Sequence, residues 1–187
     1  MVQGLEAGTA PPMRIPIESP TSYRGRNARP NWVTLMLFVG LALGAGVLGF
    51  LFSPAHSPAT AHWYAGLAKP PWTAPDHWFG PMWVVLYCLM GTAAWLVSRE
   101  RYHQRRNAAL AAYFLQLALN AAWAPLFFGA WNIGAGLFIM VALWLTVAWT
   151  IRAFAPVRAA AAVKLVPYFA WITYALALNF SVWRLNQ

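Results

Sequence analysis

Residues 32–52 read WVTLMLFVGLALGAGVLGFLF, an apolar run without a single charged side chain. An α-helix rises 1.5 Å per residue, so a run of this length covers the ~30 Å of hydrocarbon in a bilayer. Four runs of the same kind follow at 78–98, 107–128, 133–151 and 165–183, and none of the five contains Asp, Glu, Lys, Arg or His. We therefore expect five transmembrane segments.

Composition supports a membrane protein over a soluble one. Hydrophobic residues make up 60% of the chain and charged residues 9%, against about a quarter charged in soluble domains. Strands of a transmembrane barrel would alternate apolar and polar residues, which these runs do not do. Helices pair every backbone group within the segment. The predicted fold class is an all-α integral membrane protein, a bundle of five transmembrane helices.

The first 30 residues differ from the rest of the chain. They contain five prolines, four arginines and almost no large apolar side chains, so they cannot bury enough surface to offset the ordering of the backbone. They also lack the apolar core of a secretory signal peptide. We predict a disordered basic arm over 1–30, followed by a membrane domain over 31–187.

The net charge of +9 would suggest nucleic acid in a soluble chain. Here the basic residues lie between apolar runs, and most of them fall on the side of the N-terminus. That side receives eleven of the thirteen: Arg14, Arg24, Arg26, Arg29, Arg99, Arg101, Arg105, Arg106, Arg152, Arg158 and Lys164. Only Lys69 and Arg184 fall on the other side. The positive-inside rule then predicts a cytoplasmic N-terminus. Because topology explains the positive charge, we predict no nucleic-acid partner. The charge distribution does not show which membrane contains the protein.

The sequence lacks the residues that several classes of membrane protein and enzyme require. No carboxylate lies in any apolar run, so the relay of a proton-coupled transporter is missing, and no histidine is there to ligate a haem iron. The spacing of His56, His62 and His77 matches no metal motif. No nucleophile–base pair is present. We predict no metal site, no obligatory cofactor and no conventional acid–base enzyme.

The connection between the first two runs is long, spanning 53–77. Connections of this length are usually lids, binding loops or disordered segments, and this one carries Trp63, Tyr64, Leu67 and Trp72. Two interpretations stay open. The loop can close over the mouth of the bundle, in which case Trp63 and Trp72 contact a ligand, or the aromatic residues can anchor it at the level of the lipid headgroups.

Three apolar runs carry faces that could line a pocket. In 107–128, residues of one face are polar or aromatic: Tyr113, Gln116, Asn120, Trp123 and Phe127. In 78–98 the corresponding face is aromatic: Phe79, Trp83 and Tyr87. In 165–183 it contains Tyr168, Trp171, Ala175 and Leu178, with Asn179 beside it. Amides at membrane depth need partners, so these faces should point inward, where Gln116 and Asn120 either join helices or line a cavity.

These residues resemble the signature of the tryptophan-rich sensory protein (TspO) family, whose animal member is the mitochondrial translocator protein. The match includes WYAGLAKPPW at 63–72, GPMW at 80–83 with Tyr87, and QLALN at 116–120. It continues with Trp123, Pro125, FFG at 127–129, PY at 167–168, AW at 170–171, LN at 178–179 and VWR at 182–184. The resemblance covers about 32–187.

The resemblance implies a five-helix homodimer that binds porphyrins such as protoporphyrin IX, and synthetic hydrophobic ligands, beneath the long loop. The ligand would lie among 32–52, 78–98 and 165–183. By match, the pocket residues would be Trp83, Tyr87, Asn120, Trp123, Trp171 and Leu178, with Ala175 beside them. Some bacterial members are reported to degrade porphyrins in light through two pocket tryptophans, and Trp83 and Trp171 match these.

Two positions depart from the animal protein. Its sterol-recognition motif needs a tyrosine where this chain has Phe180, and an aromatic residue beside the turn after 107–128 is replaced by Ala135. Small residues spaced four apart, at Gly40/Gly44, Ala108/Ala112 and Ala118/Ala122, would let helices of two copies approach closely.

The leading hypothesis is a membrane receptor or sensor for porphyrins, acting in tetrapyrrole homeostasis or stress signalling. Its partners would be porphyrin or another hydrophobic small molecule, membrane lipid and a second copy of the chain. Two alternatives stay open: a light-dependent porphyrin-degrading enzyme that uses Trp83 and Trp171, and a passive transporter of porphyrins or lipids.

Overall fold

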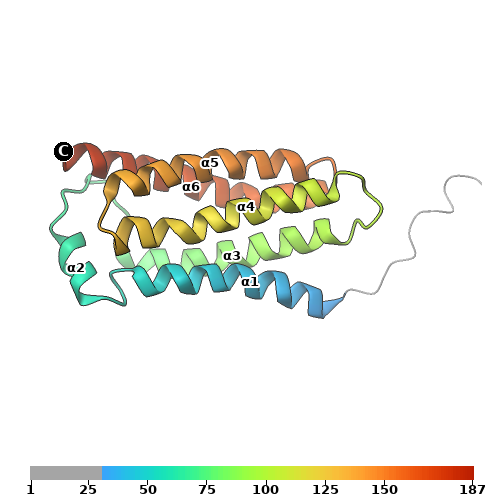
Figure 1. Cartoon of the computed structure of the whole chain (residues 1–187), viewed down its shortest axis with the longest axis horizontal. Helices are drawn as coiled ribbons and strands as arrows, with labels where there is room; N and C mark the ends of the chain where they lie inside the picture. The colour runs from blue at the N-terminus through green and yellow to red at the C-terminus, as the bar shows by residue number, and fades with distance from the viewer. Residues whose placement is uncertain (1–30) are drawn as a thin grey trace, which may run out of the picture. The chain divides into compact units, whose positions relative to one another are not determined.

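A computed structural model describes residues 31–187, and this part of the chain is built from helices (Figure 1). The predicted arm over 1–30 lies outside the described residues. The elements are α1 (Trp32–Phe52), α2 (Pro58–Ala65), α3 (Asp76–Ser98), α4 (Arg106–Ala124), a π-helical segment (Pro125–Gly129), α5 (Ile133–Phe154) and α6 (Ala159–Leu185). Five helices are long and apolar enough to cross a membrane, with the π-helical segment extending α4. The predicted fold class is confirmed.

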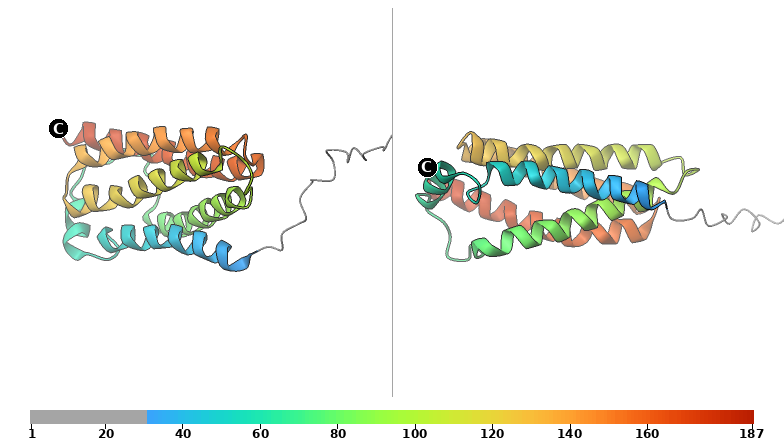
Figure 2. Two further views of the ribbon diagram at one scale, coloured as in Figure 1. Left: turned by 45° about the vertical axis from the view of Figure 1, so that its right-hand side comes forward. Right: turned by 90° about the horizontal axis from the view of Figure 1, so that it is seen from below.

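The five long helices form a closed ring in the order α1–α3–α6–α5–α4. Each helix packs against its two neighbours in this ring, whereas α3 and α4 meet only sparsely across it. Figures 1 and 2 show the long helices side by side, with the short helix α2 at the end where the chain terminates. Residues of α3, α4 and α6 can therefore meet in the interior although they are far apart in sequence.

Helix ends extend past several of the predicted segments. The helix α5 continues to Phe154 and α6 already begins at Ala159, so that Arg152 and Lys164 lie within helical turns. Long basic side chains can reach the aqueous boundary from such positions. Backbone hydrogen bonding thus carries the helices beyond the stretch that hydropathy marks as apolar.

The long connection is more ordered than its sequence suggests. Residues Pro58–Ala65 form α2, which begins at Ser57, whose hydroxyl accepts a hydrogen bond from the Thr60 backbone N–H at 3.3 Å. Further along, the carbonyl of Pro70 accepts both the backbone N–H and the hydroxyl of Thr73, at 3.1 and 2.7 Å. The prolines therefore lead into a turn that redirects the chain toward α3.

A π-helical turn ends the α4 span. Pro125 lacks a backbone N–H, and its carbonyl accepts from Ala130 at 2.8 Å, which widens the helix. This places Phe127 in the interior, where a Cβ added at Gly136 would approach its ring to 2.5 Å. Trp131 follows with a φ of 51°, in the left-handed region that costs a bulky side chain energy. The strain occurs at a tight turn into α5.

Helix α1 is the most exposed of the five. Ala42 is its one buried residue, while residues such as Val33, Met36 and Leu37 are about two-thirds exposed. An all-apolar helix of this kind is stable in lipid, where exposed Leu and Val cost nothing. It contacts α3 closely at Gly91, where an added Cβ would lie 2.5 Å from the Val39 Cα.

Candidate functional site

The predicted site residues lie in three aromatic groups. We call the first the central group; it consists of Trp83 and Tyr87 from α3, Tyr168 from α6 and Asn120 from α4. Because Trp83 and Tyr87 are one helical turn apart, their rings stack, with centroids 5.4 Å apart. The Trp83 ring also meets the edge of Tyr168 at 6.3 Å. Side chains of α3, α4 and α6 thus meet in the bundle interior, on the faces that the sequence predicted to point inward.

A hydrogen-bond chain joins the central group. The Tyr87 hydroxyl donates to Asn120 Oδ1 at 2.6 Å, and Asn120 Nδ2 donates to the Tyr168 hydroxyl at 3.0 Å. Tyr87 and Asn120 are 6% exposed and Tyr168 is fully buried. Buried polar groups must pair with one another where water is excluded. Asn120 therefore serves as a connector between α3 and α6.

The second, or outer, group surrounds Trp171. Its ring meets Phe79 of α3 at 5.6 Å and Tyr174 of α6 at 5.4 Å, and Tyr174 meets Trp72 of the long connection at 5.9 Å. Trp171 and Trp83 are thus on neighbouring helices, but their aromatic contacts belong to different groups. A ligand that touches both would have to lie along the α3–α6 seam.

The third, or loop, group lies at the end of α4. Trp63 of α2 meets the edge of Phe127 at 5.7 Å and stacks on Trp131 at 6.3 Å. Trp123 belongs to the same group and stacks on Phe127, with ring centroids 5.1 Å apart. Trp131, the residue with the positive φ, thus has its ring packed on Trp63. Both Trp63 and Trp72 therefore contact the helices.

Polar contacts attach the long connection to α6. The side chain of Asn186 accepts from the Ala68 N–H at 3.0 Å and donates to the Ala68 carbonyl at 2.9 Å, as a neighbouring strand would. The Tyr174 hydroxyl accepts from the Ala74 N–H at 2.7 Å. These bonds fix both halves of the connection to one helix. Its aromatic residues consequently keep defined positions over the bundle end.

Lys69 has contacts within the connection itself. Its ammonium donates to the Tyr64 carbonyl at 2.6 Å and lies 4.2 Å from the centre of the Tyr64 ring. An ammonium carries three donors, so two remain for another acceptor. Burial raises the pKa of Tyr64 to about 12, and the charges of Asp76 and Tyr174 act in the same direction. Lys69 thus places a positive charge beside the loop aromatics.

The remaining predicted residues continue along α6. Ala175 is half-buried and Leu178 is 8% exposed, both facing the bundle. Ala175 packs against the hydrophobic core together with Trp83, Trp123 and Trp171. Because Ala175 and Leu178 have no ring, the aromatic side chains beside them provide the surfaces on which a flat ligand could stack.

Asn179, which the sequence placed beside the predicted face, was not among the predicted ligand-binding residues. Asn179 is 3% exposed, and within 31–187 neither its Oδ1 nor its Nδ2 has a hydrogen-bond partner. The indole N–H of Trp123 is likewise buried and unpaired there. Both belong to the half of the bundle next to the long connection. The signal was available, since an amide next to Leu178 in an apolar run is costly unless something pairs with it.

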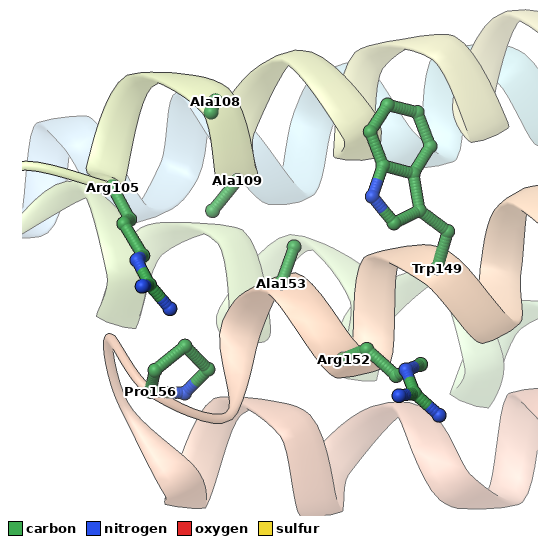
Figure 3. Close-up of a pocket in the computed structure, with 7 residues that line it drawn as sticks. All are labelled: Arg105, Ala108, Ala109, Trp149, Arg152, Ala153 and Pro156. Atoms are coloured by element: carbon green, nitrogen blue, oxygen red, sulfur yellow. The ribbon is translucent and has the colours of Figure 1, made fainter.

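Clefts also open on the outside of the described bundle, away from these groups. A cleft between α1 and α4 has a volume of about 520 Å³, and a cleft between α4 and α5 (Figure 3) has a volume of about 140 Å³. None of the nine predicted ligand-binding residues lines either cleft. The aromatic side chains along the α3–α6 seam contact one another, so a large flat ligand has to separate them on entry. Among residues 31–187, His, Cys, Asp and Glu form no group of three that could hold a metal ion.

Comparison with known proteins places this arrangement in context. The model of the TspO/MBR family matches residues 32–184. The chain is 39% identical over 155 residues to the tryptophan-rich protein TspO of Chlorobaculum tepidum, covering 82% of this chain and 96% of that protein. It is 40% identical over 161 residues to the translocator protein of Sus scrofa, covering 84% and 93%. It is 36% identical over 157 residues to the tryptophan-rich sensory protein of Cereibacter sphaeroides, covering 83% and 93%.

Proposed function

The chain belongs to the TspO/MBR family of multi-pass membrane proteins, and from this premise we propose that it is a membrane receptor or sensor that binds porphyrins of the protoporphyrin IX class. The observation that carries the proposal is that aromatic side chains surround Trp123 and Asn179 in the half of the bundle beneath the long connection, where the indole N–H and the amide atoms of these two residues are buried and have no hydrogen-bond partner within 31–187. The relatives named translocator protein and tryptophan-rich sensory protein agree with a receptor or sensor role.

A porphyrin suits this chemistry on both counts. Its flat ring offers two large apolar faces, and stacking on an aromatic side chain is worth about 0.5–1.5 kcal/mol beyond area burial. Its ring nitrogens can pair with an amide such as Asn179, which otherwise remains a buried cost. Its carboxylates would lie toward the loop end, where Lys69 has two donors to spare.

The proposed site lies along the α3–α6 seam beneath the long connection. Trp83 and Trp171 supply stacking surfaces, and Trp123 and Asn179 supply polar atoms. Entry requires the Trp83–Tyr87 stack and the Phe79–Trp171 contact to open. Such an opening would suit a sensor, because ligand binding would then change how α3 packs on α6.

Porphyrin titration in darkness tests the proposal. The shift of the porphyrin absorption band reports binding without depending on the number of tryptophans. Trp83→Ala and Trp171→Ala should each lower affinity about fivefold or more, the equivalent of about 1 kcal/mol. The Phe variants should keep most of the affinity, because they keep an aromatic face. Trp32→Ala is the matched control, since Trp32 is 61% exposed at the start of α1. Full affinity in both Ala variants would mean that porphyrin binds elsewhere.

Two further arms separate the alternative functions. Illumination of the porphyrin-bound protein, followed by analysis of porphyrin products, distinguishes a binding protein from a degrading enzyme. If the protein degrades porphyrin, Trp83→Phe and Trp171→Phe should still bind it but lose turnover. Porphyrin flux into liposomes distinguishes a transporter from both. We expect binding without product and without flux.

We propose that the N-terminal side faces the cytoplasm. The described basic residues gather at one end of the bundle, in the turns after α3 and α5 and at the start of α6, whereas Lys69 and Arg184 lie at the other end. Single cysteines at 101 and 69 in a Cys88→Ala background test this. Labelling of both from the same side would contradict it.

We also propose a homodimer. The cleft between α1 and α4 is lined by small residues, including Gly40, Gly44 and Ala118, where side chains from a second copy could approach closely. Ala112, expected at the same surface, is instead fully buried, because it lies on the interior face of α4. Ala118→Leu should shift the mass in detergent toward the monomer. Ala177→Leu, at an exposed position of α6, is the control; an equal shift in both would argue against this surface.

A further inference from the structure

Gly46 brings the backbone of α1 against the central group. This glycine is half-buried and lies beside Tyr87 of α3, the ring that stacks on Trp83. A Cβ added at Gly46 would lie 2.5 Å from Cε2 and 2.8 Å from Cδ2 of the Tyr87 ring. Carbon atoms in favourable contact are about 3.5–4.0 Å apart. The Tyr87 ring therefore occupies the space that any side chain at position 46 would need.

Two residues of the central group hold the Tyr87 ring. It stacks on Trp83 with centroids 5.4 Å apart, and its hydroxyl donates to Asn120 at 2.6 Å. The Tyr87 side chain is buried, so it cannot turn out of the bundle without losing both contacts. A ring displaced by a methyl group at position 46 consequently has to change its contact with Trp83 or with Asn120.

Helix α1 has little freedom to move away from α3, its neighbour in the ring (Figure 2). Two turns before Gly46, Val39 lies against Gly91 of α3, where an added Cβ would be 2.5 Å from the Val39 Cα. Ala42 lies between Val39 and Gly46 on the same face of α1 and is fully buried. A shift of α1 that made room at position 46 would open these close contacts.

The four glycines of α1 differ in what surrounds them. A Cβ added at Gly49 would lie 3.7 Å from the Ala124 Cβ, which is an ordinary contact, and one added at Gly40 or Gly44 would meet nothing within 4 Å. Glycine is less favourable than alanine in the interior of a helix. At Gly46 the close approach of the Tyr87 ring gives the missing side chain a specific purpose.

We propose that Gly46 is a positioning residue of the porphyrin site and that it acts through Tyr87. Because position 46 carries no side chain, the Tyr87 ring can lie against the α1 backbone while it keeps its contacts with Trp83 and Asn120. Position 46 thereby determines how much room a flat ligand finds beside Tyr87 when the stack on Trp83 opens. The inference rests on the proposed function, since it concerns the same site.

Porphyrin titration of the full-length protein in darkness tests the effect on the site. Gly46→Ala should lower the affinity for protoporphyrin IX about fivefold or more, because an extra methyl group in a filled interior displaces its neighbours. Gly49→Ala adds the same group to the same helix and should leave the affinity unchanged. Wild-type affinity in Gly46→Ala would overturn the inference alone. Absence of binding in the wild type would overturn the proposed function, and the role of Gly46 in it.

A Tyr87→Leu background separates positioning from a general effect on helix packing. Leucine has no ring to collide with, so Gly46→Ala should change the affinity of Tyr87→Leu less than about twofold. Thermal unfolding without ligand should follow the same pattern, with a lower midpoint for Gly46→Ala only when Tyr87 is present. If Gly46→Ala alone does not fold, restored folding in Gly46→Ala/Tyr87→Leu supports the inference. Equal losses in the two backgrounds would show that Gly46 does not act through Tyr87, and the inference would be wrong.

Discussion

Two buried asparagines on the inner faces of the bundle have opposite surroundings. Asn120 of α4 has both amide atoms paired, with Tyr87 and Tyr168, and so connects three helices. Asn179 of α6 is just as buried, yet neither of its amide atoms has a partner in the described part of the chain. Both are amides at membrane depth, where an unpaired polar group is expensive.

We interpret the difference as that between an amide that supports the fold and an amide that is available to a ligand. A paired amide contributes to stability and to the uniqueness of the packing. An unpaired one lowers stability, and proteins retain such groups where function requires them. We infer that the region around Asn120 holds the bundle together, whereas the region around Asn179 is kept for a ligand. Each prediction that follows tests one side of this contrast.

The largest effect is expected for Asn120→Leu. This change leaves the hydroxyls of Tyr87 and Tyr168 buried without a common partner, at a cost of about 2 kcal/mol or more. Thermal unfolding in detergent should show a midpoint several degrees lower. Gln116→Leu on the same helix is the matched control. Within the described residues Gln116 Oε1 has no partner and Nε2 donates only to the Met90 sulfur, at 4.0 Å, so Gln116→Leu should keep the midpoint or raise it. Equal destabilisation by both changes would contradict the structural role of Asn120.

Asn179→Leu should have the opposite sign. Replacing an unpaired buried amide by an apolar group of similar size should stabilise the ligand-free protein by about 1 kcal/mol. Porphyrin affinity should fall at the same time, because the ligand loses a polar partner. The two readouts are the unfolding midpoint and the dark titration. Lower stability together with unchanged affinity would assign Asn179 a structural role and remove the contrast.

A smaller change in stability is expected for Asn186, an amide that forms its hydrogen bonds with the long connection. Asn186→Ala removes both bonds to Ala68, and exposed hydrogen bonds contribute about 1 kcal/mol or less. The midpoint should change little. Hydrogen exchange should instead accelerate locally, in the segment around Ala68, while α3 and α4 keep their protection. Faster exchange throughout the bundle would show that the connection supports the whole fold.

The smallest effect concerns Tyr64. Its pKa is about 12 in the folded protein and about 10 when unfolded, so the folded state favours the neutral phenol. The resulting stability is fully present below pH 10 and is lost as the pH rises through 12. The midpoint of the wild type should therefore fall more steeply between pH 10 and 12 than that of Tyr64→Phe. Parallel curves would mean that the Tyr64 hydroxyl does not contribute.

Properties that belong to single segments could be predicted from the sequence. Whether a segment can span a membrane depends on the length and hydropathy of that segment alone, so the five long helices could be predicted. The basic residues between the apolar runs also indicated that the two ends of the bundle differ in charge. The aromatic residues at 63–72 and 80–83 placed the chain near its family. Helix ends were less accurate, because the backbone of α6 stays helical through Lys164, where hydropathy has already fallen.

Partnership between distant residues was decided only by the tertiary structure. In sequence, Asn120 and Asn179 look alike, each a single amide in an apolar run, and their difference arises from what packs against them. Tyr87 and Tyr168 form hydrogen bonds with Asn120 across separations of 33 and 48 residues, whereas no group in the described region forms a hydrogen bond with the Asn179 side chain. Hydropathy is a local property of the chain, while pairing depends on which faces the helices turn toward one another.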